Sequence, residues 1–304
     1  MVKTVLIVGG SGFVGSHLAL GLRDNYRVFA THHNHSLKIR GVTYVPCAVD
    51  NRAWMKRLVY AIEPQVLIYA TGTSNMEWAE THYHDADLMH NSGAASAVSF
   101  SELVAPRVIY LSNAFVFEGT RGNYHEGDTI LPQTVIGKSK VAGENCVKSK
   151  VLHYVILRSS PLLGRSAGMN YSFLDKLRIR LTLGQKVELP ENELYSYAPM
   201  SGMTDAIQRI IESGAKNKVF HYGGLTKLSP YELAKRFARE FGFNPDLIIP
   251  RRSVAVKKST DIADFSLNCS QLMSSLKVKG FILDEIMDDL KGRSPSPEAV
   301  VQSA

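Results

Sequence analysis

Residues 4–15 read TVLIVGGSGFVG, an apolar run that ends directly in a cluster of glycines. The run predicts a buried strand at 4–8, and apolar residues recur at helical spacing over 14–22. Glycines at this strand-to-helix turn allow a tight bend and the close approach of a phosphate to the backbone. The free N–H groups of the helix then favour negative charge. The residues expected to contact a dinucleotide there are Gly9, Ser11, Gly12, Phe13, Val14 and Gly15.

Strands and helices alternate through the first half of the chain. Such alternation is typical of right-handed βαβ units and a parallel sheet. The sequence therefore predicts an α/β fold, a doubly wound parallel Rossmann sheet with a smaller interleaved C-terminal substrate domain. Strands are expected at 27–30, 42–45, 65–70, 107–112 and 154–158, and helices at 51–63, 85–104 and 137–150. Asp50 or Asn51 is expected to cap the first of these helices.

The alternation changes after residue 160, where Ser160-Pro161 interrupts the chain. We expect a dinucleotide-binding domain at 1–160 and a mainly substrate-binding domain at 161–293, with a segment at about 199–224 returning to the sheet. A basic helix is expected at 173–183 and another helix at 229–241, whose start shows Ser229 as cap and Glu232 at the third position. The polar, proline-interrupted tail 294–304 is expected to be flexible.

Composition excludes several classes of protein. The 304 residues carry a formal charge of +7, but the basic residues are dispersed and no nucleic-acid-binding motif accompanies them. No apolar run is long enough to span a membrane. The three cysteines, Cys47, Cys146 and Cys269, lie far apart in the sequence and do not form the pattern of a disulfide framework. We expect a cytoplasmic protein without nucleic-acid or membrane partners.

The residues after the second strand bear on the choice of cofactor. NAD-binding sites place an acidic residue there for the ribose 2′-hydroxyl. This chain has Thr31, His32 and His33, followed by Lys38 and Arg40, and no acid. The loop therefore favours NADP(H), with NAD(H) as the alternative. After the third strand, Asp50 is placed either near the adenine or at the helix cap.

Four further motifs carry a resemblance to a known family. Residues 70–80 (ATGTSNMEWAE), 110–119 (YLSNAFVFEG), 132–144 (PQTVIGKSKVAGE) and 158–164 (RSSPLLG) resemble segments of the dTDP-4-dehydrorhamnose reductases. These are extended short-chain dehydrogenase/reductases. Residues 219–234 resemble a later segment of the same family, whereas Asp261-Ile262 stand where the family has Arg-Pro. The chain is also similar to the regulatory β subunit of methionine adenosyltransferase.

The resemblance implies partners and sites. It implies a nicotinamide dinucleotide, a nucleotide-sugar in a cleft between two domains, and a homodimer. The similarity to the methionine adenosyltransferase subunit implies that this scaffold can also serve as a cofactor-binding partner of another protein. Further cofactor-binding residues are then Ala70, Thr71, Gly72, Asn91 and Lys140, and the substrate cleft would hold Ser112, Asn113, Ala114, Phe115, Ser160 and Pro161.

The family's chemistry requires a tyrosine four residues before a lysine. The tyrosine gives a proton to the developing alkoxide while the lysine holds the nicotinamide ribose. The motifs on either side fix the register, so that Lys140 is retained and Ile136 occupies the tyrosine position. Asn113 occupies the position of the catalytic threonine, where an amide can hydrogen-bond a carbonyl but cannot transfer a proton.

Two hypotheses follow. In the first, the protein binds the cofactor and has lost the usual reductase chemistry, acting as a regulator or sensor or with weak activity. In the second, it is an active reductase or epimerase with a relocated acid, for which Tyr124, His125, Tyr195 and Tyr197 are the candidates. Whether the protein is an enzyme stays open between them.

Residues 80–85 (ETHYHD) alternate carboxylate and imidazole groups, which are potential ligands of a divalent ion. No second group of ligands with matching spacing accompanies them. We therefore expect solvated side chains and no metal site.

Overall fold

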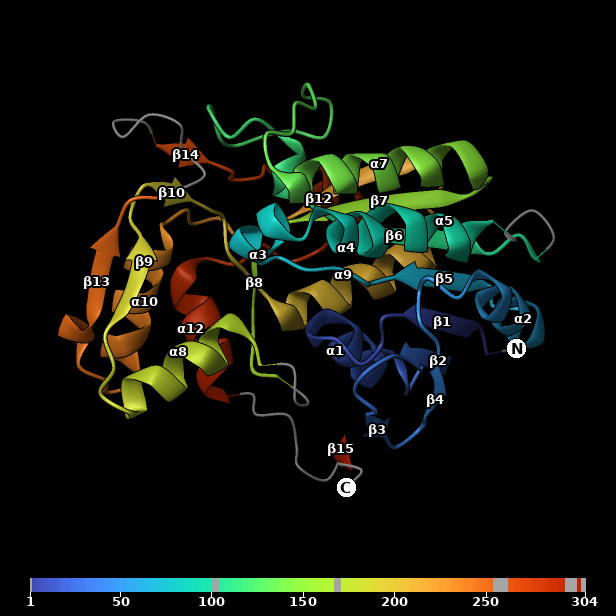
Figure 1. The fold of residues 1–304 in the computed structure, drawn as a ribbon, viewed down its shortest axis with the longest axis horizontal. Coiled ribbons are helices and arrows are strands. Elements are labelled where there is room, and N and C mark those ends of the chain that lie inside the picture. Colours follow the sequence, from blue (N-terminus) through green and yellow to red (C-terminus); the bar gives the residue numbers. More distant parts are fainter. Residues whose placement is uncertain (1, 100–103, 167–170, 254–261, 293–299, 302–304) are drawn as a thin grey trace.

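A parallel sheet of seven strands forms the centre of the computed structural model, which describes residues 2–99, 104–166, 171–253, 262–292 and 300–301 (Figure 1). The strand order is β4-β2-β1-β5-β6-β7-β12, and every neighbouring pair is parallel. Parallel neighbours need crossover connections, which are helical here except between β2 and β4, where residues 33–41 contain only the short strand β3 (Lys38–Ile39). The strands are β1 (Thr4–Val8), β2 (Arg27–His32), β4 (Val42–Pro46), β5 (Val66–Tyr69), β6 (Arg107–Asn113), β7 (Tyr154–Ser159) and β12 (Lys218–Tyr222). The predicted doubly wound α/β fold is confirmed.

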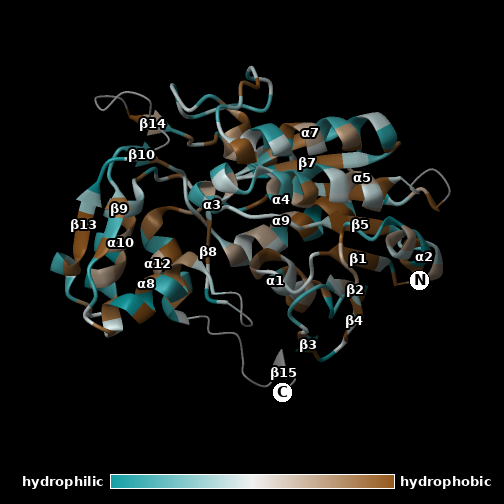
Figure 2. Cartoon of the chain, in the orientation of Figure 1, coloured by the Kyte–Doolittle hydropathy of each residue, from teal (hydrophilic) through white to brown (hydrophobic). Residues whose placement is uncertain are grey.

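Helices cover both faces of this sheet, which makes its strands nearly continuously hydrophobic (Figure 2). On one face α1 (Phe13–Leu22) and α9 (Met200–Ser213) bury Leu18, Leu22 and Ile207 against the strands. On the other face lie α2 (Arg52–Ile62), α5 (Gly93–Val98) and α7 (Val135–Lys150). The loops that are expected to bind a dinucleotide therefore emerge at the carboxyl edge of a sheet that is packed on both sides.

A smaller set of elements lies beside the sheet and shares a third hydrophobic core (Figure 1). Its strands occur in two-stranded pairs, and Phe237 and Leu177 pack between its helices. The helices are α8 (Phe173–Thr182), α10 (Pro230–Glu240) and α12 (Leu283–Gly292), with η3 (Pro245–Leu247), whereas α11 (Ser270–Leu276) packs on the sheet beside α9 and β12. The strands are β8 (Leu162–Leu163), β9 (Val187–Pro190), β10 (Glu193–Leu194), β11 (Ala198–Pro199), β13 (Ile248–Arg251) and β14 (Ala263–Asp264).

Helix caps follow from local sequence and match the predictions closely. Asn51, and not Asp50, caps α2 by accepting a hydrogen bond from the N–H of Trp54 at 3.0 Å. Ser229 and Glu232 form the expected capping box of α10. Helix α7 begins two residues earlier than predicted, because Thr134 caps it by accepting from the N–H of Gly137.

The helical stretch predicted around 85–104 is confirmed over residues 85–98, but it contains a π-helical turn that was not predicted. It consists of α4 (Tyr83–Asp87), the turn η1 (Leu88–Ser92) and α5, and a further short helix α3 (Met76–Thr81) precedes it. The phenols of Tyr69 and Tyr110 donate to the carbonyls of Met89 and His90, at 2.6 Å each. These side chains from β5 and β6 satisfy backbone groups that a wider turn leaves unpaired.

Residues 300–301 of the predicted flexible tail form β15 (Val300–Val301), which pairs antiparallel with β3 (Lys38–Ile39). The rest of that tail, residue 261, and residues 100–103 of the predicted helix lie outside the described residues. Within the described part of the chain, no helix combines the length and apolarity that a membrane crossing demands.

Candidate functional site

The loop between β1 and α1 needs glycine at several positions, because a side chain there would collide with the neighbouring backbone. Gly9 has φ +86°, which L-residues with side chains rarely adopt. A Cβ on Gly15 would lie 2.2 Å from the carbonyl oxygen of Gly9, and one on Gly10 would lie 2.4 Å from the Cβ of Ala30. No side chain caps α1 at Gly12. The loop thus presents uncapped N–H groups at a helix N-terminus, which suits a pyrophosphate.

The end of β2 extends this surface. Thr31 and His32 belong to the strand itself, which runs two residues further than predicted. The hydroxyl of Thr31 accepts from the N–H of Gly9 at 2.9 Å and so fixes the glycine loop. His32 Nδ1 is buried without a hydrogen-bond partner, whereas His33 is exposed. An unpaired buried nitrogen at this place points to a ligand or a water.

The loop after β5 lies against the glycine loop. A Cβ on Gly9 would be only 2.6 Å from Thr71 Oγ1, so the two loops touch. Thr71 Oγ1 is itself buried and has no partner. Gly72 has φ +155° and is exposed, and a Cβ there would lie 3.2 Å from Lys140 Nζ. The structure therefore brings the loops after β1 and β5 together with Lys140.

Other predicted cofactor residues lie around this centre with local partners. Asp50 is exposed beside the α2 cap. Asn91 in η1 donates to Asp87 Oδ1 at 3.0 Å. Phe13 packs edge-on against the ring of His17, at 5.0 Å between centroids.

Lys140 and Ile136 occupy the first two turns of α7. Lys140 is 6% exposed, and its Nζ donates to the carbonyl of Leu111 at 2.8 Å. Burial lowers the pKa of Lys140 to about 7, against the charge of Glu144, which raises it. Ile136 is completely buried among the apolar residues of the third core. One turn before the lysine there is thus an alkyl group packed into the protein.

Most of the predicted substrate-cleft residues contact other parts of the protein. Asn113 Oδ1 accepts from the N–H of Phe115 at 3.1 Å and caps the short helix η2 (Ala114–Val116). Ala114 and Phe115 are buried, and the N–H of Ser160 donates to the carbonyl of Tyr222. Ser160 Oγ, next to Pro161, is buried and unpartnered.

A buried ionic network beside α7 was not predicted from sequence. Arg158 donates from Nε and Nη2 to the two carboxylate oxygens of Glu144, at 2.9 and 2.8 Å, and Ser112 Oγ donates at 2.7 Å. Burial alone would raise the pKa of Glu144, but these hydrogen bonds and the nearby charges of Arg158 and Lys148 outweigh it and hold the pKa low. Ser112 is therefore turned into the protein, and its side chain does not face the substrate cleft in which it was expected.

The candidate relocated acids have structural partners, with one exception. Tyr124 OH accepts from the N–H groups of Gly119, Thr120 and Arg121. Tyr195 OH donates to Glu193 Oε2 at 2.9 Å. Burial raises the pKa of both Tyr195 and Tyr197 well above the usual value. Only His125 among the four is exposed.

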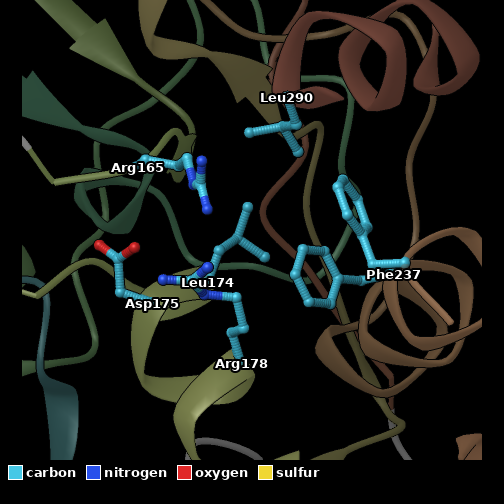
Figure 3. Close-up of a pocket in the computed structure, with 7 residues that line it drawn as sticks. Arg165, Leu174, Asp175, Arg178, Phe237 and Leu290 are labelled. Carbon is cyan, nitrogen blue, oxygen red and sulfur yellow. The ribbon is translucent and has the colours of Figure 1, made fainter. Parts of the chain in front are cut away.

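A small cavity lies between α8, α10 and α12 (Figure 3). Arg165 and Arg178 reach toward Leu174, and Phe237 lies across from them. Leu290 and Phe241 complete the lining. Its volume of about 30 Å³ is far below the roughly 300–1,000 Å³ of ligand pockets.

The carboxylate and histidine run 80–85 is engaged in local contacts. Glu80 Oε1 accepts from the N–H of Val135, and the ring of His82 stacks on Trp78 at 4.7 Å. His84 packs on Tyr83. In the part of the chain that the structure describes, no group of three His, Cys, Asp or Glu side chains is arranged to hold a metal.

Fold, strand order and glycine loop together define a Rossmann-like α/β fold. The family model described as the RmlD substrate binding domain matches residues 3–279, and the chain belongs to this family.

Known relatives agree with this assignment. The chain is 21% identical over 281 residues to the methionine adenosyltransferase 2 subunit beta of Bos taurus, covering 89% of this chain and 81% of that protein. It is 25% identical over 234 residues to the dTDP-4-dehydrorhamnose reductase of Aggregatibacter actinomycetemcomitans, covering 76% of each. Both predicted resemblances are confirmed.

Two solved structures share the fold over nearly the whole chain. The dTDP-4-dehydrorhamnose reductase of Bacillus anthracis, in complex with NADP, has a TM-score of 0.82 at 19% identity and covers 96% of this chain and 99% of its own. The Bordetella bronchiseptica enzyme WbmH, in complex with NAD+, has a TM-score of 0.80 at 18% identity, covering 94% and 96%.

Proposed function

We propose that this protein binds a nicotinamide dinucleotide and has lost the tyrosine-dependent reductase chemistry of its family. The observation that carries the proposal is the buried Ile136 one turn before Lys140. A bound nicotinamide supplies or accepts a hydride. Reduction of a ketone also needs a proton for the oxygen, and an isobutyl-like group has none to give. General acid catalysis contributes about 10²–10⁴-fold, so its loss leaves little turnover.

The dinucleotide fits the residues that remain. The glycine loop would hold the pyrophosphate, Thr71 Oγ1 and His32 Nδ1 offer unpaired polar atoms, and Lys140 lies behind the exposed Gly72. Lys140 would bind ribose hydroxyls by direct donation. The remaining predicted contacts of residues 9–15 and of Thr31, His33, Asp50, Ala70 and Asn91 belong to the same proposal.

NADP(H) is the preferred cofactor in this proposal, with NAD(H) as the alternative. Residues 31–40 contain no carboxylate that would repel a 2′-phosphate, and Lys38 and Arg40 are exposed beside them. The Bacillus anthracis reductase holds NADP, whereas WbmH holds NAD+. Direct titration with both pairs decides between them.

The biological role that we propose is regulatory or sensory, with a protein partner, as the name of the bovine relative describes a subunit. A homodimer and a nucleotide-sugar ligand in the predicted cleft beside Asn113 complete the proposal; Ser112, whose hydroxyl donates to the buried Glu144, is not part of it. The free cysteines fit a reducing compartment such as the cytoplasm. Measurement of the molar mass in solution tests the dimer.

Family membership favours one alternative, an active reductase or epimerase with a relocated acid. Of its candidates, Tyr124, Tyr195 and Tyr197 are buried, and only His125 is exposed. The alternative therefore needs a movement of these loops when a substrate binds.

Restoring the missing groups tests the proposal. Ile136→Tyr with Asn113→Thr should raise NADPH oxidation with dTDP-4-dehydrorhamnose by about 100-fold over the wild type, because a phenol beside Lys140 restores the proton donor. Ile136→Phe with Asn113→Thr is the matched control, since it differs from the first variant by one hydroxyl.

The gain should disappear when Lys140→Ala is added. A wild type that already turns over at a rate typical of enzymes, about 1 s⁻¹ or more, and loses this activity on Lys140→Ala, would refute the proposal.

A further inference from the structure

His90 is a fully buried histidine in the π-helical turn η1, and none of the motifs above predicted a role for it. Its Nε2 lies 3.1 Å from the backbone nitrogen of Thr73, in the loop after β5. Its Nδ1 lies 2.7 Å from Ser139 Oγ, in the first turns of α7. One imidazole therefore joins two segments of the candidate dinucleotide site, and Ser139 directly precedes Lys140.

The direction of these hydrogen bonds follows from the groups present. A backbone N–H can only donate, so Nε2 of His90 accepts from Thr73. The proton of the neutral ring is then on Nδ1, which donates to Ser139. Ser139 Oγ in turn donates to the carbonyl of Ile136 at 3.0 Å. The resulting chain runs from the β5 loop, through His90 and Ser139, to the residue that replaces the tyrosine.

The site is shaped for this ring by two glycines. A Cβ on Gly72 would lie 2.8 Å from ring atoms of His90, and one on Gly143 would lie 2.3 Å from the carbonyl oxygen of His90. The phenol of Tyr110 donates to the same carbonyl at 2.6 Å. Main chain and side chain of His90 are thus both held in place.

The imidazole remains neutral. Burial, together with the nearby charge of Lys140, lowers the pKa of His90 to about 2. The ring therefore acts as a fixed donor and acceptor at every physiological pH, and it supplies no proton to a substrate.

We infer that His90 is a positioning residue for the nicotinamide half of the dinucleotide, linking the β5 loop to the Lys140 turn of α7. The inference rests on the proposed function. Without the link, Gly72 and Lys140 would not be held at a fixed separation, and a nicotinamide ribose bound beside them would have to order both segments. Ordering free segments lowers affinity. The adenosine half, at the ends of β1 and β2, does not depend on the link.

The test compares two ligands in calorimetric titrations, NADP+ and the adenosine fragment 2′,5′-ADP. His90→Leu keeps most of the volume of the ring and removes both hydrogen bonds. We expect about ten-fold weaker binding of NADP+ and less than a two-fold change for 2′,5′-ADP, because two ordinary hydrogen bonds are lost. His221→Leu, at another fully buried histidine, is the matched control and should not discriminate between the two ligands.

Ser139→Ala provides a second route that leaves the imidazole in place. It should weaken NADP+ selectively, by about three-fold, and its effect should disappear in the His90→Leu background, because both act through one link. If His90→Leu does not fold, Ser139→Ala alone carries the test.

Equal losses for both ligands, or no loss for NADP+, would overturn the inference while leaving the proposed function intact. A wild type that binds 2′,5′-ADP but not NADP+ would also overturn it. Binding of neither ligand, and of no NAD+ either, would remove the proposed function itself.

Discussion

The two ends of the candidate dinucleotide site differ in how their polar groups are used. At the ends of β2 and β5, His32 Nδ1 and Thr71 Oγ1 are buried and unpaired, beside a loop that only glycine permits. At the start of α7, Ile136 is apolar, Asn113 caps η2, and Ser112 is bound to Glu144. The first end has polar atoms without a partner inside the protein, whereas the groups at the second end are engaged in packing and internal hydrogen bonds.

This difference teaches that binding and chemistry are separable in this fold. Phosphate recognition depends mainly on backbone N–H groups and the absence of side chains. Proton transfer depends on one hydroxyl at one position. A single replacement can therefore remove the reaction and leave the cofactor site as it is.

Mutations at the second end, beside α7, should lower the free energy of unfolding the most. Glu144→Gln removes the charge that pairs with the buried Arg158, and we expect a loss of about 3–5 kcal/mol in the free energy of unfolding. Denaturant unfolding measures it. Asp205→Asn breaks a half-exposed pair with Arg209 and should cost no more than about 0.5 kcal/mol. Equal losses would contradict the contrast between buried and exposed pairs.

Mutations at the first end, which includes the glycine loop, should weaken ligand binding the most. Gly15→Ala places a methyl group against Gly9 and should weaken NADP+ about 100-fold, since a displaced loop loses charge-assisted hydrogen bonds to the pyrophosphate. Gly127→Ala is the control, because a Cβ there meets no atom within 4 Å. Fluorescence titration measures both, and a Gly15→Ala protein that binds within three-fold of the wild type would show that the pyrophosphate lies elsewhere.

Lys140 connects the two ends and gives a pH signature. Its pKa is lowered from 10.5 to about 7 on folding, so above pH 7 the unfolded chain binds one more proton than the folded protein. Stability should therefore rise with pH, by up to about 1.4 kcal/mol per pH unit from this group. The rise is absent below pH 7, where both states are protonated.

Lys140→Met should remove this rise. Urea unfolding between pH 7.5 and 8.5 is the appropriate measurement, because at higher pH the thiols of Cys47 and Cys269 oppose it. Burial raises the pKa of these thiols to about 11 and about 12. Parallel pH profiles of wild type and variant would show that Lys140 is not desolvated.

The order of strands and helices and the position of the glycine loop could be predicted from sequence, because the residues that determine them are close together in the chain. Caps lie within three residues of the groups that they bind, as at Asn51 and Ser229. The π-helical turn η1 could not be predicted. It depends on phenols of Tyr69 and Tyr110, which lie 20 residues from the carbonyls they bind.

By itself the sequence determined the parallel α/β architecture, the glycine loop, and the placement of Ile136 one turn before Lys140. Each follows from hydrophobic periodicity or from the spacing of residues within one segment of the chain. Only the tertiary structure decided that Tyr124 and Tyr195 are engaged, that Glu144 binds Arg158, and that His90 reaches Ser139, 49 residues away. Such contacts join segments that chain spacing does not relate, and packing of the whole chain determines which polar groups remain free to bind a ligand.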